Sequence, residues 1–248
     1  MQKINIYGQV NNYLIFRTDR LGDFLVSAIL IKSIKKNDPS SKVTLITSNK
    51  NHFYAKNFSY IDEIIFLENN FYSKLKIIFK LRKNYFQNII IHDNKKRSKF
   101  IASFIKFKNK IIIENQESFT HIEIIKMILK KMNFSFFDEA LNILVDRYIL
   151  NEEKNFIQIH FDEKWIHKDY IEKFRNIEPT EKELFNFISS VNSKTDTKLT
   201  ITSGYKLPNV LKNILPEIKK LNISVHENLD FMELEKVTSN SKVLISCH

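Results

Sequence analysis

The chain has 248 residues, of which 43% are hydrophobic and 12% aromatic, and it carries a formal net charge of +11. This composition is typical of a folded protein with a sizeable core and excludes a disordered chain. The sequence has no run of about 18 apolar residues, the length that a membrane-spanning helix needs. The single cysteine, Cys247, excludes an internal disulfide and an all-cysteine metal site. The first residues lack the pattern of a secretory signal, so we expect a cytoplasmic protein.

The positive charge is confined to the first part of the chain. Residues 1–150 hold 25 lysines and arginines and 13 acidic residues, whereas residues 151–248 hold 14 and 15. One explanation is a compositional bias toward lysine, asparagine and isoleucine. The other is a first domain that faces an anionic partner, either a phosphorylated substrate or a membrane surface.

Short β-branched runs alternate with longer amphipathic segments along the first half. We expect strands at residues 12–17, 42–47, 62–67, 87–92 and 110–113. We expect helices between and after them at residues 22–36, 49–57, 71–83, 95–106 and 119–132. This alternation predicts βαβ units and a parallel, doubly wound sheet.

A second alternation begins near residue 155. We expect strands at 156–160, 198–202, 222–226 and 242–246, and helices at 180–193, 207–220 and 230–240. Thr180 and Glu183 have the spacing of a capping box at the start of the first of these helices. We therefore predict two Rossmann-like domains, residues 1–150 and 151–248. Because the sequence stops where a strand ends, we expect the second domain to be incomplete.

One turn stands out between the first strand and the first helix. It reads Arg20-Leu21-Gly22-Asp23 and contains one of only three glycines in the chain. Glycine at such a place indicates a tight bend or the close approach of a ligand to the backbone. Asp23 is both a candidate helix cap and a candidate catalytic base, and the cations Arg17 and Arg20 suit an anionic ligand.

Other candidates follow later strands. Asp93 and Arg97 come after the strand that ends near residue 92, and they are either a solvated helix start or a phosphate contact. Residues 95–110 alternate basic and apolar side chains, which is typical of a membrane-surface helix or of a helix packed on a sheet. No pair of histidines has zinc-site spacing, so we expect no metal and no cofactor.

In order, these features resemble the heptosyltransferases, family nine of the glycosyltransferases. The likeness starts with the strand, the Leu-Gly-Asp turn and the apolar helix of residues 14–34. It continues through residues 85–98 and 120–123, the Lys/Trp loop within 157–174, the glycine turn at 199–204 and the segment 229–246. Cys247 and His248 stand where the family's Asp-Ser or Asp-Thr donor loop begins.

The resemblance implies a GT-B fold, in which two Rossmann-like domains face a cleft. It implies inverting, metal-independent transfer of a heptose-like sugar from an ADP-heptose-like nucleotide-sugar donor to a lipopolysaccharide or other surface-glycan acceptor. Asp23 would be the general base, and the donor would bind Lys164, Lys168, Ser203 and Gly204. The acceptor or its phosphate would bind Arg20, Gly22, Asp93 and Arg97.

The same resemblance implies an anionic, lipid-linked acceptor and peripheral contact with the inner face of a membrane. Two alternatives stay open at this point. One is a truncated, non-catalytic protein that binds a glycan or a nucleotide. The other is a basic nucleic-acid-binding protein, which is disfavoured because the lysines belong to no recognisable nucleic-acid module.

Overall fold

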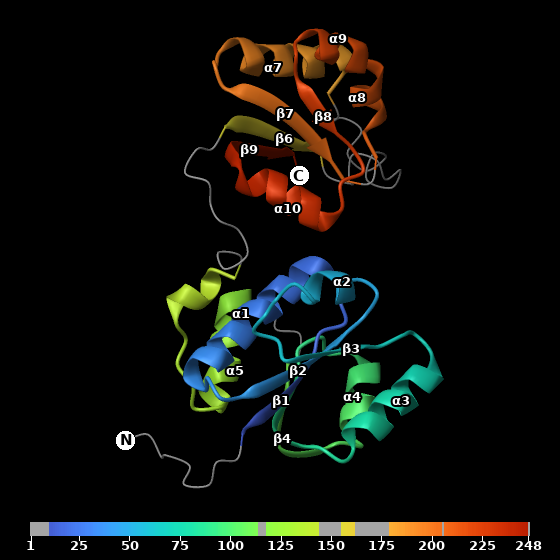
Figure 1. Ribbon diagram of the computed structural model, residues 1–248, viewed down its shortest axis with the longest axis vertical. Helices are drawn as coiled ribbons and strands as arrows, with labels where there is room; N and C mark the ends of the chain where they lie inside the picture. The colour runs from blue at the N-terminus through green and yellow to red at the C-terminus, as the bar shows by residue number, and fades with distance from the viewer. Residues whose placement is uncertain (1–9, 114–117, 144–154, 162–178, 205, 248) are drawn as a thin grey trace. The chain divides into compact units, whose positions relative to one another are not determined.

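The computed structural model describes residues 10–113, 118–143, 155–161, 179–204 and 206–247. The chain divides into two compact units, Met1–Leu144 and Val145–His248. Each unit is an open parallel sheet with helices packed against it (Figure 1). The expected α/β class with two Rossmann-like domains is therefore confirmed.

The first unit has a five-stranded parallel sheet in the order β3-β2-β1-β4-β5. The strands are β1 (Asn12–Phe16), β2 (Lys42–Thr47), β3 (Glu63–Phe66), β4 (Tyr85–Ile91) and β5 (Lys106–Ile112). The helices are α1 (Leu21–Asn37), α2 (His52–Ala55), α3 (Phe71–Leu81), α4 (Lys96–Ala102) and α5 (His121–Lys131), followed by the 3-10 helix η1 (Asp138–Leu141).

Alternation along β1 decides which helices cover which face of this sheet. Leu14 and Phe16 are fully buried in a core cluster that includes the apolar sides of α3 and α4. Tyr13 and Ile15, also buried, point to the opposite face because successive strand residues alternate. Helices α1 and α5 contact each other and belong to that second layer.

The second unit has a four-stranded parallel sheet in the order β8-β7-β6-β9. The strands are β6 (Phe156–Phe161), β7 (Lys198–Ser203), β8 (Ser224–His226) and β9 (Ser241–Cys247). The helices are α7 (Glu181–Ser193), α8 (Asn209–Asn213), α9 (Leu215–Lys220) and α10 (Phe231–Ser239).

The two faces of this second sheet differ in chemistry. Ile159, Phe161 and Ile201 pack with the apolar sides of α7, α8 and α9. On the alternate positions Gln158 and Thr202 are buried, and the Gln158 amide donates to the Thr202 hydroxyl at 2.8 Å. Helix α10 has no buried residue among those described.

Two expected helices end differently from the prediction. Helix α4 stops at Ala102 because β5 begins at Lys106, where Lys106, Phe107 and Lys108 alternate with the period of a strand. The helix expected at 207–220 is two helices, α8 and α9, which meet at Ile214. Pro216 lies in the first turn of α9, where its missing N–H costs no helical hydrogen bond.

In the part of the chain that the structure describes, no helix has the length and apolar character needed to cross a bilayer.

Candidate functional site at the carboxyl edge of the first sheet

The order of strands in the first sheet reverses beside β1. The chain passes from β1 outward to β2 and β3, then returns to the other side of β1 for β4 and β5. Ligands of doubly wound sheets bind outside the carboxyl ends of the strands at such a switch point. The loops after β1 (residues 17–20) and after β4 (residues 92–95) contain or adjoin every candidate residue of the first half.

Asp93 joins these two loops. Its Oδ2 accepts hydrogen bonds from the Thr18 hydroxyl at 2.6 Å and the Thr18 backbone N–H at 3.3 Å. The Ser98 hydroxyl donates to the same oxygen at 2.7 Å, and the Lys95 backbone N–H donates to Oδ1 at 3.2 Å. This buried carboxylate therefore organises the edge of the sheet, and its predicted contact with an acceptor or phosphate stays a prediction.

Three donors converge on the backbone carbonyl of Thr18. Its oxygen accepts from Ser48 Oγ at 3.0 Å, Arg97 Nη2 at 3.1 Å and Lys95 Nζ at 3.2 Å. Arg97 also donates to the Thr18 hydroxyl at 2.7 Å, while its Nε is buried without a hydrogen bond to any described residue. Lys95 Nζ also forms an ion pair with Asp19 Oδ1 at 2.8 Å. Arg97 is only half-buried, so its charge remains near the surface, where it attracts anions.

A buried arginine fixes the first turn of α1. Arg17 donates from Nε to the Asp23 carbonyl at 2.7 Å and from Nη1 to the His92 carbonyl at 2.6 Å. Its Nη2 lies 3.8 Å from Asp23 Oδ1, and the Asp23 side chain is 37% exposed. Arg17 thus holds the backbone of Asp23 in place, while the Asp23 carboxylate stays accessible. An accessible carboxylate can accept a proton from a bound ligand.

The sequence did not identify Thr18 as a site residue, and it indicated Arg17 only as a cation suited to an anionic ligand, whereas the Arg17 side chain is buried. The signal that could have identified them as site residues is their position in the sequence, because both directly follow Phe16, the fully buried last residue of β1. Asn51, in the loop after β2, was missed as well, and its amide donates to the Arg17 carbonyl at 2.8 Å.

The turn that contains Gly22 has an ordinary backbone. Gly22 is the second residue of α1 and does not have a positive φ. A Cβ added to it would meet no atom within 4 Å. A positive φ is therefore not the reason for a glycine here, and the space around Gly22 is open. Arg20, the N-cap of α1, is exposed, and its side chain makes no capping hydrogen bond.

His92 lies buried behind this edge. Its Nδ1 is 2.8 Å from the hydroxyl of Ser27 on α1. Burial, and then the positive charges of Arg17 and His121, lower the pKa of His92 far below its usual range. The imidazole is therefore neutral at physiological pH and connects β4 to α1 through the Ser27 hydroxyl.

In the second unit the structure describes two of the four donor-binding candidates. Ser203 ends β7 with a buried hydroxyl that has no hydrogen-bond partner among the described residues. The carbonyl of Gly204 accepts from the backbone N–H of Asn228 at 2.9 Å, which ties the loop after β7 to the loop after β8. Lys164 and Lys168 lie outside the described residues.

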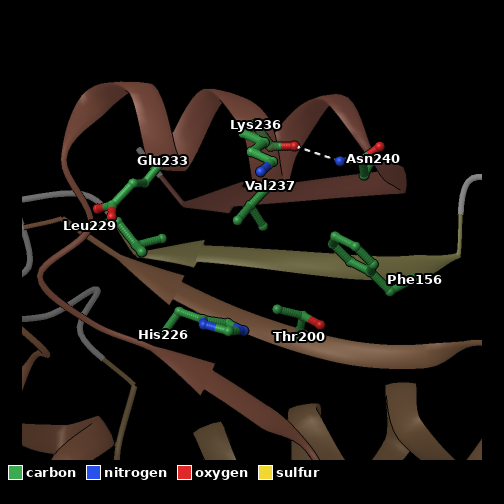
Figure 2. A pocket seen from close by; sticks show the side chains of 8 residues that line it. All are labelled: Phe156, Thr200, His226, Leu229, Glu233, Lys236, Val237 and Asn240. Carbon is green, nitrogen blue, oxygen red and sulfur yellow. Dashed lines mark hydrogen bonds between the residues drawn. The ribbon is translucent and has the colours of Figure 1, made fainter. Parts of the chain in front are cut away.

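A separate groove of about 370 Å³ lies in the second unit between α10 and the sheet (Figure 2). Its lining residues are Phe156, Thr200, His226, Leu229, Glu233, Lys236, Val237 and Asn240. Ser203 and Gly204 are not among them, so this groove is distinct from the predicted donor residues.

Within the described ranges there is no group of three or more His, Cys, Asp or Glu side chains placed to hold a metal ion.

Comparison with solved structures shows the fold of glycosyltransferases. The E. coli heptosyltransferase WaaC with ADP-2-deoxy-2-fluoro heptose aligns with a TM-score of 0.68 and 10% identity, over 95% of this chain and 82% of that one. A glycosyl transferase of family 9 from Veillonella parvula aligns with a TM-score of 0.67 and 12% identity, over 98% and 77%. No protein-family model and no curated sequence matches the chain.

The same fold also occurs outside the transferases. A structure from Listeria monocytogenes assigned as a UDP-N-acetylglucosamine 2-epimerase aligns with a TM-score of 0.52 and 12% identity, over 96% of this chain and 74% of that one. The expected resemblance to heptosyltransferases and the GT-B type of architecture are confirmed at the level of the fold. The chemistry has to be argued from the site.

Proposed function

We propose that this protein is a glycosyltransferase that moves a heptose-like sugar from a nucleotide-sugar donor to a lipopolysaccharide or other surface-glycan acceptor. The observation that supports it most is the anchored, solvent-open carboxylate of Asp23 at the switch point of a fold shared with heptosyltransferases. We propose inverting, metal-independent transfer, as the sequence resemblance implies.

In the proposed reaction Asp23 is the general base. An acceptor hydroxyl oxygen attacks the anomeric carbon of the donor sugar and forms the new glycosidic bond. Its proton passes to the Asp23 carboxylate, while the bond from the anomeric carbon to the diphosphate oxygen breaks and the nucleoside diphosphate leaves with the electron pair. Arg17 positions the base through its bond to the Asp23 carbonyl.

The first unit would hold the acceptor. Arg20 and Arg97 would attract its anionic groups, and the open space at Gly22 would let a ligand approach the backbone of the first turn of α1. Asp93 would act by holding the loops in place.

The second unit would hold the donor. The related structure of WaaC contains ADP-2-deoxy-2-fluoro heptose, so we propose an ADP-heptose-like donor. Ser203 and Gly204, at the carboxyl end of β7, would lie near the nucleotide. Lys164 and Lys168 would stabilise the negative charge that grows on the departing diphosphate.

The decisive experiment measures sugar transfer from ADP-heptose to a lipid-linked oligosaccharide acceptor by the purified protein and by Asp23→Asn. We expect the variant to lose at least 100-fold in kcat with a KM for donor within threefold of wild type, since general-base catalysis typically contributes about 10²–10⁴-fold. Asp138→Asn removes an exposed carboxylate on η1 and is the charge-matched control, with unchanged transfer.

Undiminished transfer by Asp23→Asn would exclude Asp23 as the base. Donor binding without any transfer by the wild type would instead support the non-catalytic alternative, in which the chain binds a nucleotide or glycan.

A further inference from the structure

The net charge of the molecule is concentrated in one stretch. Residues 69–113 contain twelve lysines and arginines and one acidic residue, the buried Asp93. The formal charge of this stretch is therefore +11, equal to that of the whole chain. It covers α3, β4, α4 and β5, and α3 and α4 lie side by side on one face of the first sheet (Figure 1).

Helix α3 presents aromatic side chains to solvent. Ile77, Ile78 and Leu81 are buried against the sheet. Tyr72 and Phe79 lie on the opposite side of the helix, where they are 83% and 56% exposed. The guanidinium of Arg82 lies over the Phe79 ring, 4.5 Å from its centroid.

Helix α4 repeats this pattern. Ser98, Ile101 and Ala102 face the core, whereas Phe100 is 40% exposed. Phe104, just after the helix, is 52% exposed and packs edge to face on Phe100 with ring centroids 5.2 Å apart. Together the two helices form a surface, here called the α3/α4 face, whose outward side chains are Tyr72, Lys76, Phe79, Lys83, Lys96, Lys99, Phe100 and Phe104.

The exposed lysines of the neighbouring strand have a simpler explanation. β5 is an edge strand, and Lys106, Lys108 and Lys110 discourage other strands from pairing with it. That explanation does not extend to Tyr72, Phe79 and Phe100, because exposing aromatic rings on the outer sides of helices protects no edge.

We propose that the α3/α4 face docks on an anionic lipid bilayer. Its lysines complement the charge of acidic headgroups, and its phenylalanine and tyrosine rings enter the interface between headgroups and acyl chains. Helix α4 starts directly after the loop of Lys95, so the docked face adjoins the candidate site. The inference extends the lipid-linked acceptor of the proposed function, but bilayer binding itself needs neither donor nor transfer.

The experiment measures co-sedimentation of the full chain with phosphatidylcholine vesicles containing 30% phosphatidylglycerol, or none, at about 0.1 M salt. We expect binding to the anionic vesicles only, weakening as salt rises. The variant Lys76→Ala/Lys83→Ala/Lys99→Ala should lower the partition coefficient roughly a hundredfold, or about fivefold per lysine, which corresponds to about 1 kcal/mol each. The variant Tyr72→Ser/Phe79→Ser/Phe100→Ser should lower it at least tenfold.

Matched controls lie on the second unit. Lys182→Ala/Lys219→Ala/Lys220→Ala and Phe187→Ser remove exposed side chains of the same types there and should bind as wild type does. Hydrogen exchange of the wild type with and without vesicles, which needs no variant, should show protection confined to α3 and α4.

Equal losses in the control variants, no binding of the wild type to anionic vesicles, or protection elsewhere would overturn the proposal. Binding of a duplex oligonucleotide that depends on the same lysines, without vesicle binding, would replace it with a nucleic-acid surface. Vesicle binding by a protein that transfers no sugar would overturn the proposed function and leave this inference standing.

Discussion

Thr18 and Asp93 stand 75 residues apart and share two hydrogen bonds through one carboxylate oxygen, at 2.6 Å to the Thr18 hydroxyl and 3.3 Å to its backbone nitrogen. Thr18 follows β1 and Asp93 follows β4. Their hydrogen bonds therefore link the two loops that flank the switch point. The Thr18 hydroxyl donates its one proton to Asp93 and accepts from Arg97. A candidate ligand-binding edge is thus held by a buried polar network.

Replacing Asp93 should destabilise the first unit. Asp93→Ala leaves the Thr18 and Ser98 donors without their acceptor, so we expect a loss of about 2–3 kcal/mol in the free energy of unfolding. Urea unfolding followed by limited proteolysis would measure it, because only fragments from residues 1–144 should become susceptible earlier. An unchanged midpoint would show that the network contributes nothing to stability.

Gly22→Ala should separate stability from function. The added methyl group meets open space within a helix, so the free energy of unfolding should stay the same or rise by up to about 1 kcal/mol. Sugar transfer should fall at least tenfold, because the methyl group would occupy the space that an approaching acceptor needs. Full activity of a stable Gly22→Ala protein would show that no ligand approaches this backbone.

The neutral, buried His92 predicts that the first unit loses stability in mild acid. Its pKa in the folded state lies below the ordinary value of 6.5, so the unfolded chain binds more protons below that pH. The contribution of His92 to the free energy of unfolding is therefore fully present above about pH 6.5. Below that pH the free energy of unfolding falls, by at most about 1.4 kcal/mol per pH unit. Urea unfolding at pH 7.5, 6.0 and 5.0 would measure this slope.

Two comparisons test the assignment to His92. The slope should flatten in His92→Gln and persist in His226→Gln, which changes an exposed histidine. In the wild type, NMR titration should find the His92 ring neutral at pH 6.5 and protonated only at lower pH. A ring that protonates near pH 6.5 would contradict the prediction.

Thr180→Ala should weaken the second unit alone. The Thr180 hydroxyl accepts from the Glu183 backbone N–H at 3.3 Å, and the Glu183 carboxylate accepts from the Thr180 N–H at 2.9 Å, so the expected capping box is present. Loss of an N-cap costs about 1 kcal/mol. Hydrogen exchange should increase in α7 and remain unchanged in α1, and faster exchange in both helices would contradict a local effect.

Much of the architecture was predictable because its signals are local. The first four strands of the first sheet contain short apolar runs, and α3 and α5 have clear apolar sides. For this reason β1 and β2 were predicted within a residue of their ends. One error comes from a segment with two competing periods. Residues 95–106 contain a short helix and the approach to an edge strand, and the basic-aromatic pattern fits both.

The site was predictable only in part. The sequence identified Arg20, Gly22, Asp23, Asp93 and Arg97 as candidates, and the structure shows that they gather along two adjacent loops. Which side chain reaches which atom depends on pairing between β1 and β4, whose residues are far apart in sequence. For that reason the sequence could not show that Arg17 lies between Asp23 and the His92 carbonyl. The roles given to the candidate residues remain predictions.

The convergence of Ser48, Lys95 and Arg97 on the Thr18 carbonyl has a consequence for ligand binding. These side chains already make hydrogen bonds in the free protein, so a ligand at this edge would meet a largely preorganised surface. The entropic cost of ordering it, about 0.5–1.5 kcal/mol for each flexible side chain, is already included in the free energy of folding. Affinity for an anionic group at the first unit should therefore depend little on induced fit, and association there should be limited by diffusion and electrostatic attraction.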